Sequence, residues 1–312
     1  MKALVTGCAG FIGSTLTDRL LKDGFEVIGI DRFSDYYSRE IKERNLNHAI
    51  KHSGFTLLEE DIVNMNTFPE VEYIFHLAAQ AGVRASWGKN FDVYIRDNIQ
   101  ATQRLLEFYK EKKIHKFVYS SSSSVYGDSE LPMREDGSVQ PVSPYGVTKL
   151  AAEHLCYLYW KNYGVPTISL RYFTVYGPRQ RPDMAIHKFV KAILQGESIT
   201  IYGEGKQTRD FTFIDDIVES NVVAASSACE GEMFNIGGAN RISVNDLVSN
   251  IEEITGNHAL IRHIEEQKGD VRDTWSDARK AEKLLVWSAK TDIYEGLSRY
   301  VNWIKDMNNE KW

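Results

Sequence analysis

Short apolar runs alternate with longer amphipathic stretches through the first half of the chain. Each run has the length of a buried β-strand, and strands are predicted at residues 2–6, 27–30, 55–58, 73–77, 116–120 and 167–171. Apolar residues at helical spacing predict helices from the end of the glycine stretch 7–13 to residue 22, and at 98–112 and 144–163. Strands that alternate with helices in this way predict an α/β fold built on a parallel, doubly wound sheet.

The link between the first predicted strand and the first predicted helix is rich in glycine. Its sequence is Gly7-Cys8-Ala9-Gly10-Phe11-Ile12-Gly13. The second predicted strand ends in Asp31, which Arg32 follows. This is the order of a Rossmann-type dinucleotide-binding unit, because glycines let the backbone approach a pyrophosphate that the helix N-terminus binds. Asp31 would accept hydrogen bonds from the adenosine ribose and repel a 2′-phosphate, so NAD is favoured over NADP, although Arg32 weakens this preference. The alternative is a structural glycine turn in another α/β protein.

Further candidate contacts fall at the carboxyl ends of other predicted strands, which is where doubly wound sheets bind ligands. They are Asp61 with Ile62, the stretch Leu77-Ala78-Ala79-Gln80, and the serine run from Ser120 to Ser124. Asp61 and Ile62 are expected to contact the adenine, whereas a lone Asp after a strand is equally typical of a helix cap. The shared position of these residues along the sheet edge predicts one ligand site.

A tyrosine and a lysine share one face of the predicted helix at 144–163. Ser143 can cap this helix and Pro144 suits its first position. Tyr145 and Lys149 are four residues apart, so they lie on the same side. An ammonium near a phenol lowers the pKa of the tyrosine, whose oxygen can then take a proton from a sugar hydroxyl. Alone, this pair is a weak signal, because many helices carry one by chance.

The composition changes after Arg171 towards turn formers and cations. Residues 174–183 predict a turn-rich segment, 184–194 a helix, and 211–225 a strand and then a helix that rejoins the large domain, with Asp215 and Asp216 as caps. We therefore predict a dinucleotide-binding domain of residues 1–173 and 211–235 and a smaller α/β substrate-binding lobe of residues 174–210 and 236–312. Arg209 and Arg272 are candidate phosphate clamps, and the alternative for each is an ordinary surface or ion-pair residue.

Charge and cysteine content narrow the class of partner. The 312 residues carry a net charge of −6 with no basic run, which argues against nucleic acid. Cys8, Cys156 and Cys229 are odd in number and widely spaced, so they suggest neither a disulfide framework nor a metal site and favour a reducing cytoplasm. No apolar run approaches the roughly 18 residues of a membrane span.

Taken together, the motifs resemble the extended short-chain dehydrogenase/reductase superfamily, in its nucleotide-sugar epimerase/dehydratase branch. The shared segments span nearly the whole chain and are Thr6 to Gly13, His76 to Ala79, Asn98, Ser122 with Val125 to Gly127, Tyr145 to Lys149, Leu170 to Phe173, and Arg209 to Phe211. The resemblance implies tightly bound NAD, with Asn98 and Tyr172 among its contacts. It also implies a homodimer that pairs through the helices near 98–112 and 147–162, although an apolar helix there is equally explained by burial within its own domain.

The same resemblance implies a reaction. Tyr145 acts as the base on the sugar at C4, Lys149 lowers its pKa and holds the nicotinamide ribose, and Ser122 hydrogen-bonds the 4-oxygen. Hydride then returns to the other face of the rotated 4-keto sugar, which gives 4-epimerisation without net redox change.

The serine run separates the branches of this family. Dehydration at C5 and C6 needs a carboxyl group that protonates the departing hydroxyl. Relatives that dehydrate, and those that decarboxylate a uronic acid, resemble acid-containing sequences where this chain has Ser122, Ser123 and Ser124. These serines therefore favour an epimerase over a 4,6-dehydratase or a uronate decarboxylase. A catalytically idle NAD-binding sensor is a reading of another class, which the presence of both Tyr145 and Lys149 disfavours.

The segment after Phe173 bears on the choice of sugar, because it is similar to that of UDP-glucuronate 4-epimerases. An arginine could bind a C5 carboxylate in a bidentate pair and hold it so that the 4-keto sugar does not lose carbon dioxide. We nominate Arg181 with Thr174, and Arg84 as a weaker candidate. The predicted substrate contacts are completed by Ser122, Ser123, Ser124, Tyr145, Ala185, Tyr202, Arg209 and Arg272. UDP-glucuronate is favoured, and UDP-glucose or UDP-N-acetylglucosamine is the alternative.

Overall fold

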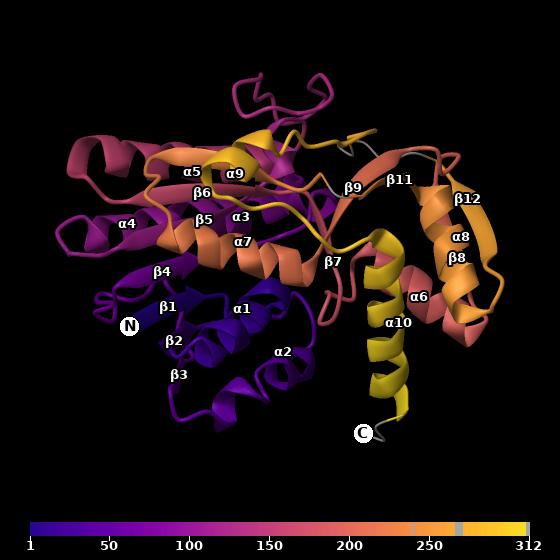
Figure 1. Cartoon of the computed structure of the whole chain (residues 1–312), viewed down its shortest axis with the longest axis horizontal. Helices are drawn as coiled ribbons and strands as arrows, with labels where there is room; N and C mark the ends of the chain where they lie inside the picture. The colour runs from indigo at the N-terminus through magenta and orange to yellow at the C-terminus, as the bar shows by residue number, and fades with distance from the viewer. Residues whose placement is uncertain (239, 266–270, 310–312) are drawn as a thin grey trace.

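A parallel sheet of seven strands forms the larger part of the described molecule (Figure 1). The structure is a computed structural model that describes residues 1–238, 240–265 and 271–309. The strands, in their order across the sheet, are β10 (Glu232–Ile236), β6 (Thr167–Tyr172), β5 (Lys116–Ser122), β4 (Tyr73–His76), β1 (Lys2–Thr6), β2 (Glu26–Ile30) and β3 (Phe55–Leu58). The order reverses direction at β1, as in a doubly wound fold, so the predicted fold class is confirmed.

Helices cover both faces of this sheet because its strands bury alternate side chains on opposite sides. Ala3 and Val5 of β1 belong to the core under α1 (Phe11–Lys22) and α7 (Ile214–Ser226). Leu4, between them, belongs to the core under α4 (Ala101–Tyr109) and α5 (Pro144–Tyr163). The short helix α9 (Arg279–Leu284) packs beside β10 at the sheet edge. Between β2 and β3 lie α2 (Arg39–Asn45) and a 3₁₀ turn at Ala49–Lys51.

A second group of elements lies beyond one side of the large sheet (Figure 1). It contains a three-stranded sheet of β11 (Asn240–Ser243), β9 (Thr208–Phe213) and β7 (Thr174–Tyr176), and a parallel pair of β12 (Leu260–Ile264) with β8 (Ser198–Tyr202). Its helices are α6 (Ala185–Gln195), α8 (Val244–Thr255) and α10 (Ile293–Asn309). The predicted return of the chain to the large sheet at residue 211 is wrong for the strand, because β9 pairs with β7 and β11. Of the segment 211–225, it is the helix α7 that packs on the large sheet, against β5 and β6. The division into two domains stays a prediction.

Several element ends differ from the sequence expectation. The helix predicted at 98–112 begins earlier, with α3 (Phe91–Tyr94), continues through a π-helical turn (Ile95–Gln100) and ends with α4 at Tyr109. Asp215 and Asp216 do not cap α7, because the chain passes from β9 straight into the helix and Phe213 occupies the cap position. Asp216 instead accepts a hydrogen bond from the Thr291 amide at 3.0 Å. Short 3₁₀ turns lie at Arg84–Ser86, Gly88–Asn90 and Ser123–Val125. Among the described helices, none combines the length and apolar composition needed to cross a bilayer.

A buried histidine joins the ends of β1 and β4 to α4. His76 Nδ1 lies 2.8 Å from Thr6 Oγ1, and Nε2 lies 2.9 Å from Thr102 Oγ1. The Thr102 hydroxyl donates its proton to the carbonyl of Asn98 at 2.6 Å, so it must accept a hydrogen bond from His76 Nε2. Nε2 therefore carries a proton. Burial, with a smaller effect of Lys149, lowers the pKa of His76 to about 3, so the imidazole is neutral at neutral pH. This chain of hydrogen bonds holds two strand ends in register with the helix behind them.

The depressed pKa of His76 predicts a loss of stability in acid. Because the unfolded imidazole titrates near 6.5, the contribution of the neutral side chain is complete above that pH and is lost as the pH falls towards about 3. Between pH 7.5 and pH 5 the folded state should lose about 2 kcal/mol from this group. His76→Gln should be less stable at pH 7.5 and lose about 2 kcal/mol less over the same range, measured by urea unfolding. Equal losses in both proteins would contradict the assignment.

Candidate active site

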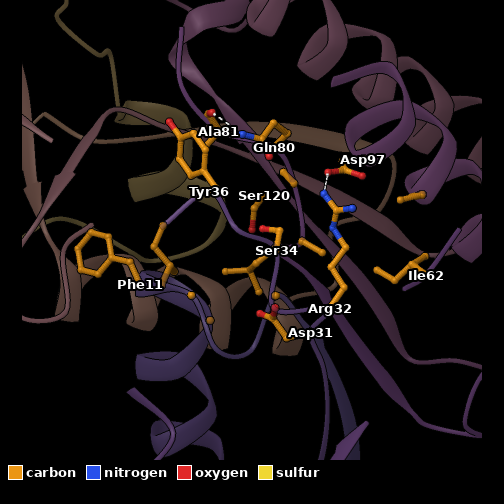
Figure 2. A pocket seen from close by; sticks show the side chains of 18 of the residues that line it. Phe11, Asp31, Arg32, Ser34, Tyr36, Ile62, Gln80, Ala81, Asp97 and Ser120 are labelled. Atoms are coloured by element: carbon orange, nitrogen blue, oxygen red, sulfur yellow. Dashed lines mark hydrogen bonds and ion pairs between the residues drawn. The ribbon is translucent and has the colours of Figure 1, made fainter. Parts of the chain in front are cut away.

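One pocket lies along the carboxyl ends of β1, β2, β4 and β5 (Figure 2). Most of the predicted cofactor and catalytic residues line it, and these are Gly7, Gly10, Phe11, Ile12, Gly13, Asp31, Arg32, Asp61, Ile62, Leu77, Ala78, Ala79, Gln80, Tyr145, Lys149 and Tyr172. Of the predicted substrate contacts, Arg181 also lines it. Residues from seven segments of the chain thus share one cavity, because parallel strands end at the same edge of the sheet.

The glycine turn passes close to neighbouring backbone. Gly7 has a φ of +70°, and a Cβ there would lie 2.9 Å from the amide nitrogen of Ala78. A Cβ on Gly13 would lie 2.1 Å from the carbonyl oxygen of Gly7. Side chains are therefore excluded where a pyrophosphate would approach the helix N-terminus, which suits a dinucleotide.

Asp31 braces this turn as well as facing the pocket. Its two carboxylate oxygens accept hydrogen bonds from the backbone amides of Ala9, at 3.1 Å, and Phe33, at 2.8 Å. Ala9 is buried, and its carbonyl accepts a hydrogen bond from Asn45 Nδ2 at 3.0 Å. Ala9 is not among the residues that line the pocket, and its backbone hydrogen bonds anchor the turn. Its predicted contact with the cofactor stays a prediction.

Arg32 belongs to a cluster of alternating charges. Its Nη2 lies 2.5 Å from Asp97 and its Nη1 3.6 Å from Asp61 (Figure 2 shows the contact with Asp97). Arg96 bridges the same two acids, with Nη2 2.6 Å from Asp61 and Nη1 3.0 Å from Asp97. Asp61 does not cap a helix, since its Oδ1 accepts the amide hydrogen of Val63 in a turn. A 2′-phosphate here would meet an arginine whose charge is already balanced, so Arg32 does not weaken the preference for NAD.

Tyr145 begins α5 as the sequence predicts. The Ser143 hydroxyl caps the helix by accepting the Gly146 amide at 3.1 Å, and Pro144 occupies the first turn. Burial raises the pKa of the Tyr145 phenol, while a hydrogen bond to Ser122 and the positive charge of Arg181 act against this rise. The expected effect of Lys149 on the phenol is therefore not what the structure shows.

Lys149 directs its ammonium elsewhere. Its Nζ donates to the carbonyl of Ser120 at 2.7 Å and lies 4.8 Å from the centre of the Tyr119 ring. Burial lowers the pKa of Lys149 to about 8, and the neighbouring Glu153 and Cys156 act in the opposite direction. Spacing along a helix brought the tyrosine and lysine to one face, but the strand beneath determines which group the ammonium contacts.

Asn98 supports the pocket without lining it. It sits in the π-helical turn, where its Oδ1 accepts the Gln80 amide at 2.7 Å. Its Nδ2 donates to the Gln80 carbonyl at 3.1 Å and to Thr148 Oγ1 at 2.9 Å. Asn98 thus links the loop after β4 to helix α5, and its predicted contact with the cofactor stays a prediction. Tyr172, which does line the pocket, hydrogen-bonds Ser120 Oγ and Asn221 Oδ1.

Arg181 reaches the pocket from the loop before α6. Its Nε and Nη2 form a bidentate pair with Asp183 at 2.9 and 3.0 Å, and the hydroxyl of Tyr36 donates to the same carboxylate at 3.3 Å. The loop after β2 and the loop after β7 therefore meet at this ion pair.

The remaining predicted substrate contacts lie outside the lining of this pocket; they are Ser122, Ser123, Ser124, Thr174, Ala185, Arg84, Tyr202, Arg209 and Arg272. Arg84 stacks on the Tyr202 ring, with its guanidinium carbon 4.0 Å from the ring centre. Arg209 Nη1 donates to the Arg272 carbonyl at 2.6 Å. The structure thus brings Arg84 to Tyr202 and Arg209 to Arg272. The roles of these residues in substrate binding stay predictions.

Sequence reasoning missed several residues of the pocket wall, namely Ser34, Tyr36, Tyr37, Lys42 and Asp97. The first three follow Asp31 in the loop after β2, so the position at a strand end was a signal that applied to them too. Lys42 and Asp97 lie on helices, and their place in the pocket depends on how those helices pack.

Comparison with known proteins shows the family of this chain. Residues 3–237 match the model of the NAD dependent epimerase/dehydratase family. The chain belongs to this family.

Relatives within the family are similar along their whole length. A Bacillus subtilis protein described as an uncharacterized UDP-glucose epimerase is 45% identical over 312 residues, which is 98% of this chain and 99% of that protein. A UDP-glucuronate 4-epimerase of Thermodesulfobacterium geofontis is 42% identical over 311 residues, covering 97% and 96%. The crystal structure of Bacillus cereus UDP-glucuronic acid 4-epimerase in complex with UDP-glucuronic acid and NAD is 44% identical, covers 98% of this chain and 100% of that chain, and has a TM-score of 0.96.

In this epimerase/dehydratase, Gly13→Ala should abolish tight NAD binding. The added Cβ would collide with the Gly7 carbonyl at 2.1 Å and displace the turn, so we expect NAD affinity to fall at least about tenfold, a change of about 1.4 kcal/mol. The control is Gly164→Ala, which adds a Cβ at a glycine with no neighbour within 4 Å; this glycine has a φ of +71°. It should cost about 1 kcal/mol of stability and keep NAD. Fluorescence titration with NAD measures the affinity of both variants. Unchanged affinity in Gly13→Ala would refute the contact between residue 13 and the Gly7 carbonyl as a requirement for NAD binding.

Proposed function

We propose that this protein is an NAD-dependent isomerase that interconverts UDP-glucuronate and UDP-galacturonate by 4-epimerisation. The observation that carries the proposal is that Tyr145, Lys149 and Arg181 line the same pocket as the glycine turn and Asp31. The names of the similar Thermodesulfobacterium and Bacillus cereus proteins support the same reaction and the same cofactor.

The side chains around Tyr145 suit proton transfer at the sugar C4 oxygen. NAD, when bound, supplies the reversible oxidation of that carbon. Tyr145 can take the proton of the 4-hydroxyl and return it. Burial raises the pKa of its phenol, and the hydrogen bond of Ser122 together with the charge of Arg181 opposes that rise. Lys149, with its pKa lowered to about 8 by burial, remains mostly cationic at neutral pH.

The positions of the acidic residues in the pocket wall favour epimerisation over dehydration. Within the described lining they are Asp31, Glu60, Asp61 and Asp97, at the ends of β2 and β3 and on the π-helical turn. The residues that follow Ser122 are Ser123 and Ser124, which carry no carboxyl group that could protonate a departing hydroxyl. An oxidation followed by a reduction at C4 needs no such acid.

Arg181 favours a uronate as the substrate, but its ion pair with Asp183 is also compatible with a second candidate substrate. Asp183 occupies the Nε and Nη2 positions of the guanidinium. A substrate carboxylate would therefore bind the remaining donors or displace Asp183. With a neutral hexose the ion pair could stay intact, and the name of the Bacillus subtilis relative also points to UDP-glucose. UDP-glucose 4-epimerisation is thus the alternative function.

We also propose a homodimer in the cytoplasm. Helix α5 exposes Val147, Tyr157 and Leu158, at 46%, 42% and 49% of their surfaces, which is the outward apolar face that a helix pairing would cover. All three cysteines are free thiols, as a reducing compartment would leave them. The two-domain division, with 1–173 and 211–235 against 174–210 and 236–312, is part of the same proposal.

Proton NMR of UDP-glucuronate incubated with the purified protein, without added cofactor, tests the function. We expect UDP-galacturonate to appear, and Tyr145→Phe to keep NAD while turnover falls about 10²- to 10⁴-fold, since the variant lacks the proton acceptor. A UDP-pentose product would indicate a decarboxylase, and no change would favour a neutral sugar. Undiminished turnover by Tyr145→Phe would refute the role of the phenol.

Arg181→Ala should separate the two candidate substrates. If the guanidinium binds the C5 carboxylate, kcat/KM for UDP-glucuronate should fall at least about tenfold more than for UDP-glucose. Arg179→Ala is the matched control, because this neighbouring arginine pairs with Asp18 of α1 at 2.6 Å instead of lining the pocket. Equal losses on the two sugars in Arg181→Ala would remove the carboxylate argument.

A further inference from the structure

A buried ion pair lies directly behind the catalytic end of the pocket. Glu153 of α5 and Arg171 of β6 are bidentate, with Nη2 to Oε2 at 2.8 Å and Nε to Oε1 at 3.0 Å. Their side chains are only 2% and 3% exposed. Arg171 also donates to the hydroxyl of Tyr126 at 2.9 Å. Charges this deep cost several kcal/mol to desolvate, so the fold does not retain them for stability alone.

Glu153 also contacts the strand that carries the catalytic serine. Its Oε1 accepts a hydrogen bond from the hydroxyl of Ser121. Ser121 lies between Ser120, whose carbonyl accepts from Lys149, and Ser122, which hydrogen-bonds Tyr145. One acid thus holds the end of β5 at the point where two catalytic groups contact it.

Glu153 follows Lys149 by one helical turn and faces the same way. We propose that Glu153 is a positioning residue that keeps Lys149 cationic and holds the end of β5 against α5, so that Ser122 and Tyr145 stay in hydrogen-bonding geometry. Arg171 fixes the orientation of Glu153 through their bidentate pair. The inference rests on the proposed epimerase reaction, and it assigns to Glu153 a role separate from those of Tyr145, Lys149 and Ser122.

The other groups around Lys149 cannot supply this charge. His76 of β4 is neutral because burial lowers its pKa to about 3. Burial raises the pKa values of Tyr119 of β5 and of Cys156 of α5, so both stay protonated. Tyr145 has a raised pKa as well.

One further acid and one further cation lie on neighbouring elements. Asp97, on the adjoining π-helical turn, is engaged by Arg32 and Arg96. Arg171 of β6 is a cation and is neutralised by Glu153. Within the described residues around Lys149, Glu153 is therefore the carboxylate that favours its ammonium, and it opposes the effect of burial.

The test is the pH profile of kcat for the NAD-loaded enzyme. In Glu153→Gln the amide keeps the shape of the side chain but removes its charge, so Lys149 should lose its proton at lower pH. We expect the alkaline limb of kcat to move down by about one pH unit. NAD affinity followed by fluorescence against pH, which needs no turnover, should weaken over the same shifted range. An unmoved alkaline limb would overturn the proposal.

Arg171→Lys is the matched control. It breaks the bidentate geometry and destabilises the same buried site while it keeps both charges, so its alkaline limb should stay within about 0.3 pH units of the wild type. An equal shift in this variant would mean that the pair acts only through packing, which would also overturn the proposal. If Glu153→Gln does not fold, Glu153→Gln with Arg171→Met removes both charges together and leaves no unpaired cation, so the alkaline limb should move down by less than one pH unit. An unmoved limb in this double variant would overturn the proposal.

These readouts distinguish failure of the inference from failure of the proposed function. Absence of epimerisation by the wild-type protein would contradict the function, whatever the variants do. The dependence of NAD affinity on pH would still decide whether Glu153 controls the charge near Lys149.

Discussion

Three consecutive serines of β5 meet three residues of α5 that are spaced one helical turn apart. Ser122 hydrogen-bonds Tyr145, the Ser120 carbonyl accepts from Lys149, and the Ser121 hydroxyl donates to Glu153. A strand residue advances about 3.3 Å and a helical turn about 5.4 Å, so such a match requires the strand end and the helix to be held at one relative position. The catalytic geometry of the pocket depends on this contact between strand and helix.

Buried polar groups hold the surrounding elements at that position. His76 links the ends of β1 and β4 to α4 through two threonine hydroxyls. Asn98, one turn before Thr102, links the loop after β4 to Thr148 of α5. Every such group would cost energy if it lost its partner, and the strand ends are therefore tied to both helices behind the pocket.

Charge is balanced at the two ends of the pocket in different ways. At the end of the pocket beside Asp31, where the adenosine is expected, Arg32 and Arg96 alternate with Asp61 and Asp97. Each arginine is paired with both acids, which leaves no unpaired cation in this cluster to attract a phosphate. At the sugar end, Arg181 is paired with Asp183 and acts on Tyr145 from a distance. The first arrangement suits a cofactor without a 2′-phosphate, and the second leaves an arginine that a uronate can engage.

The sequence by itself determined the order of strands and helices, the glycine turn, the acid at Asp31 and the shared face of Tyr145 and Lys149, because these follow from local periodicity and from residues close together in the chain. The tertiary structure alone decided the partners: Ser120 for Lys149, Asp183 for Arg181, Asp97 for Arg32, Asn45 for Ala9 and Thr148 for Asn98. It also placed β9 with β7 instead of in the large sheet. Partners of this kind come from segments far apart in sequence, and their distance, burial and charge balance are set only when those segments pack together.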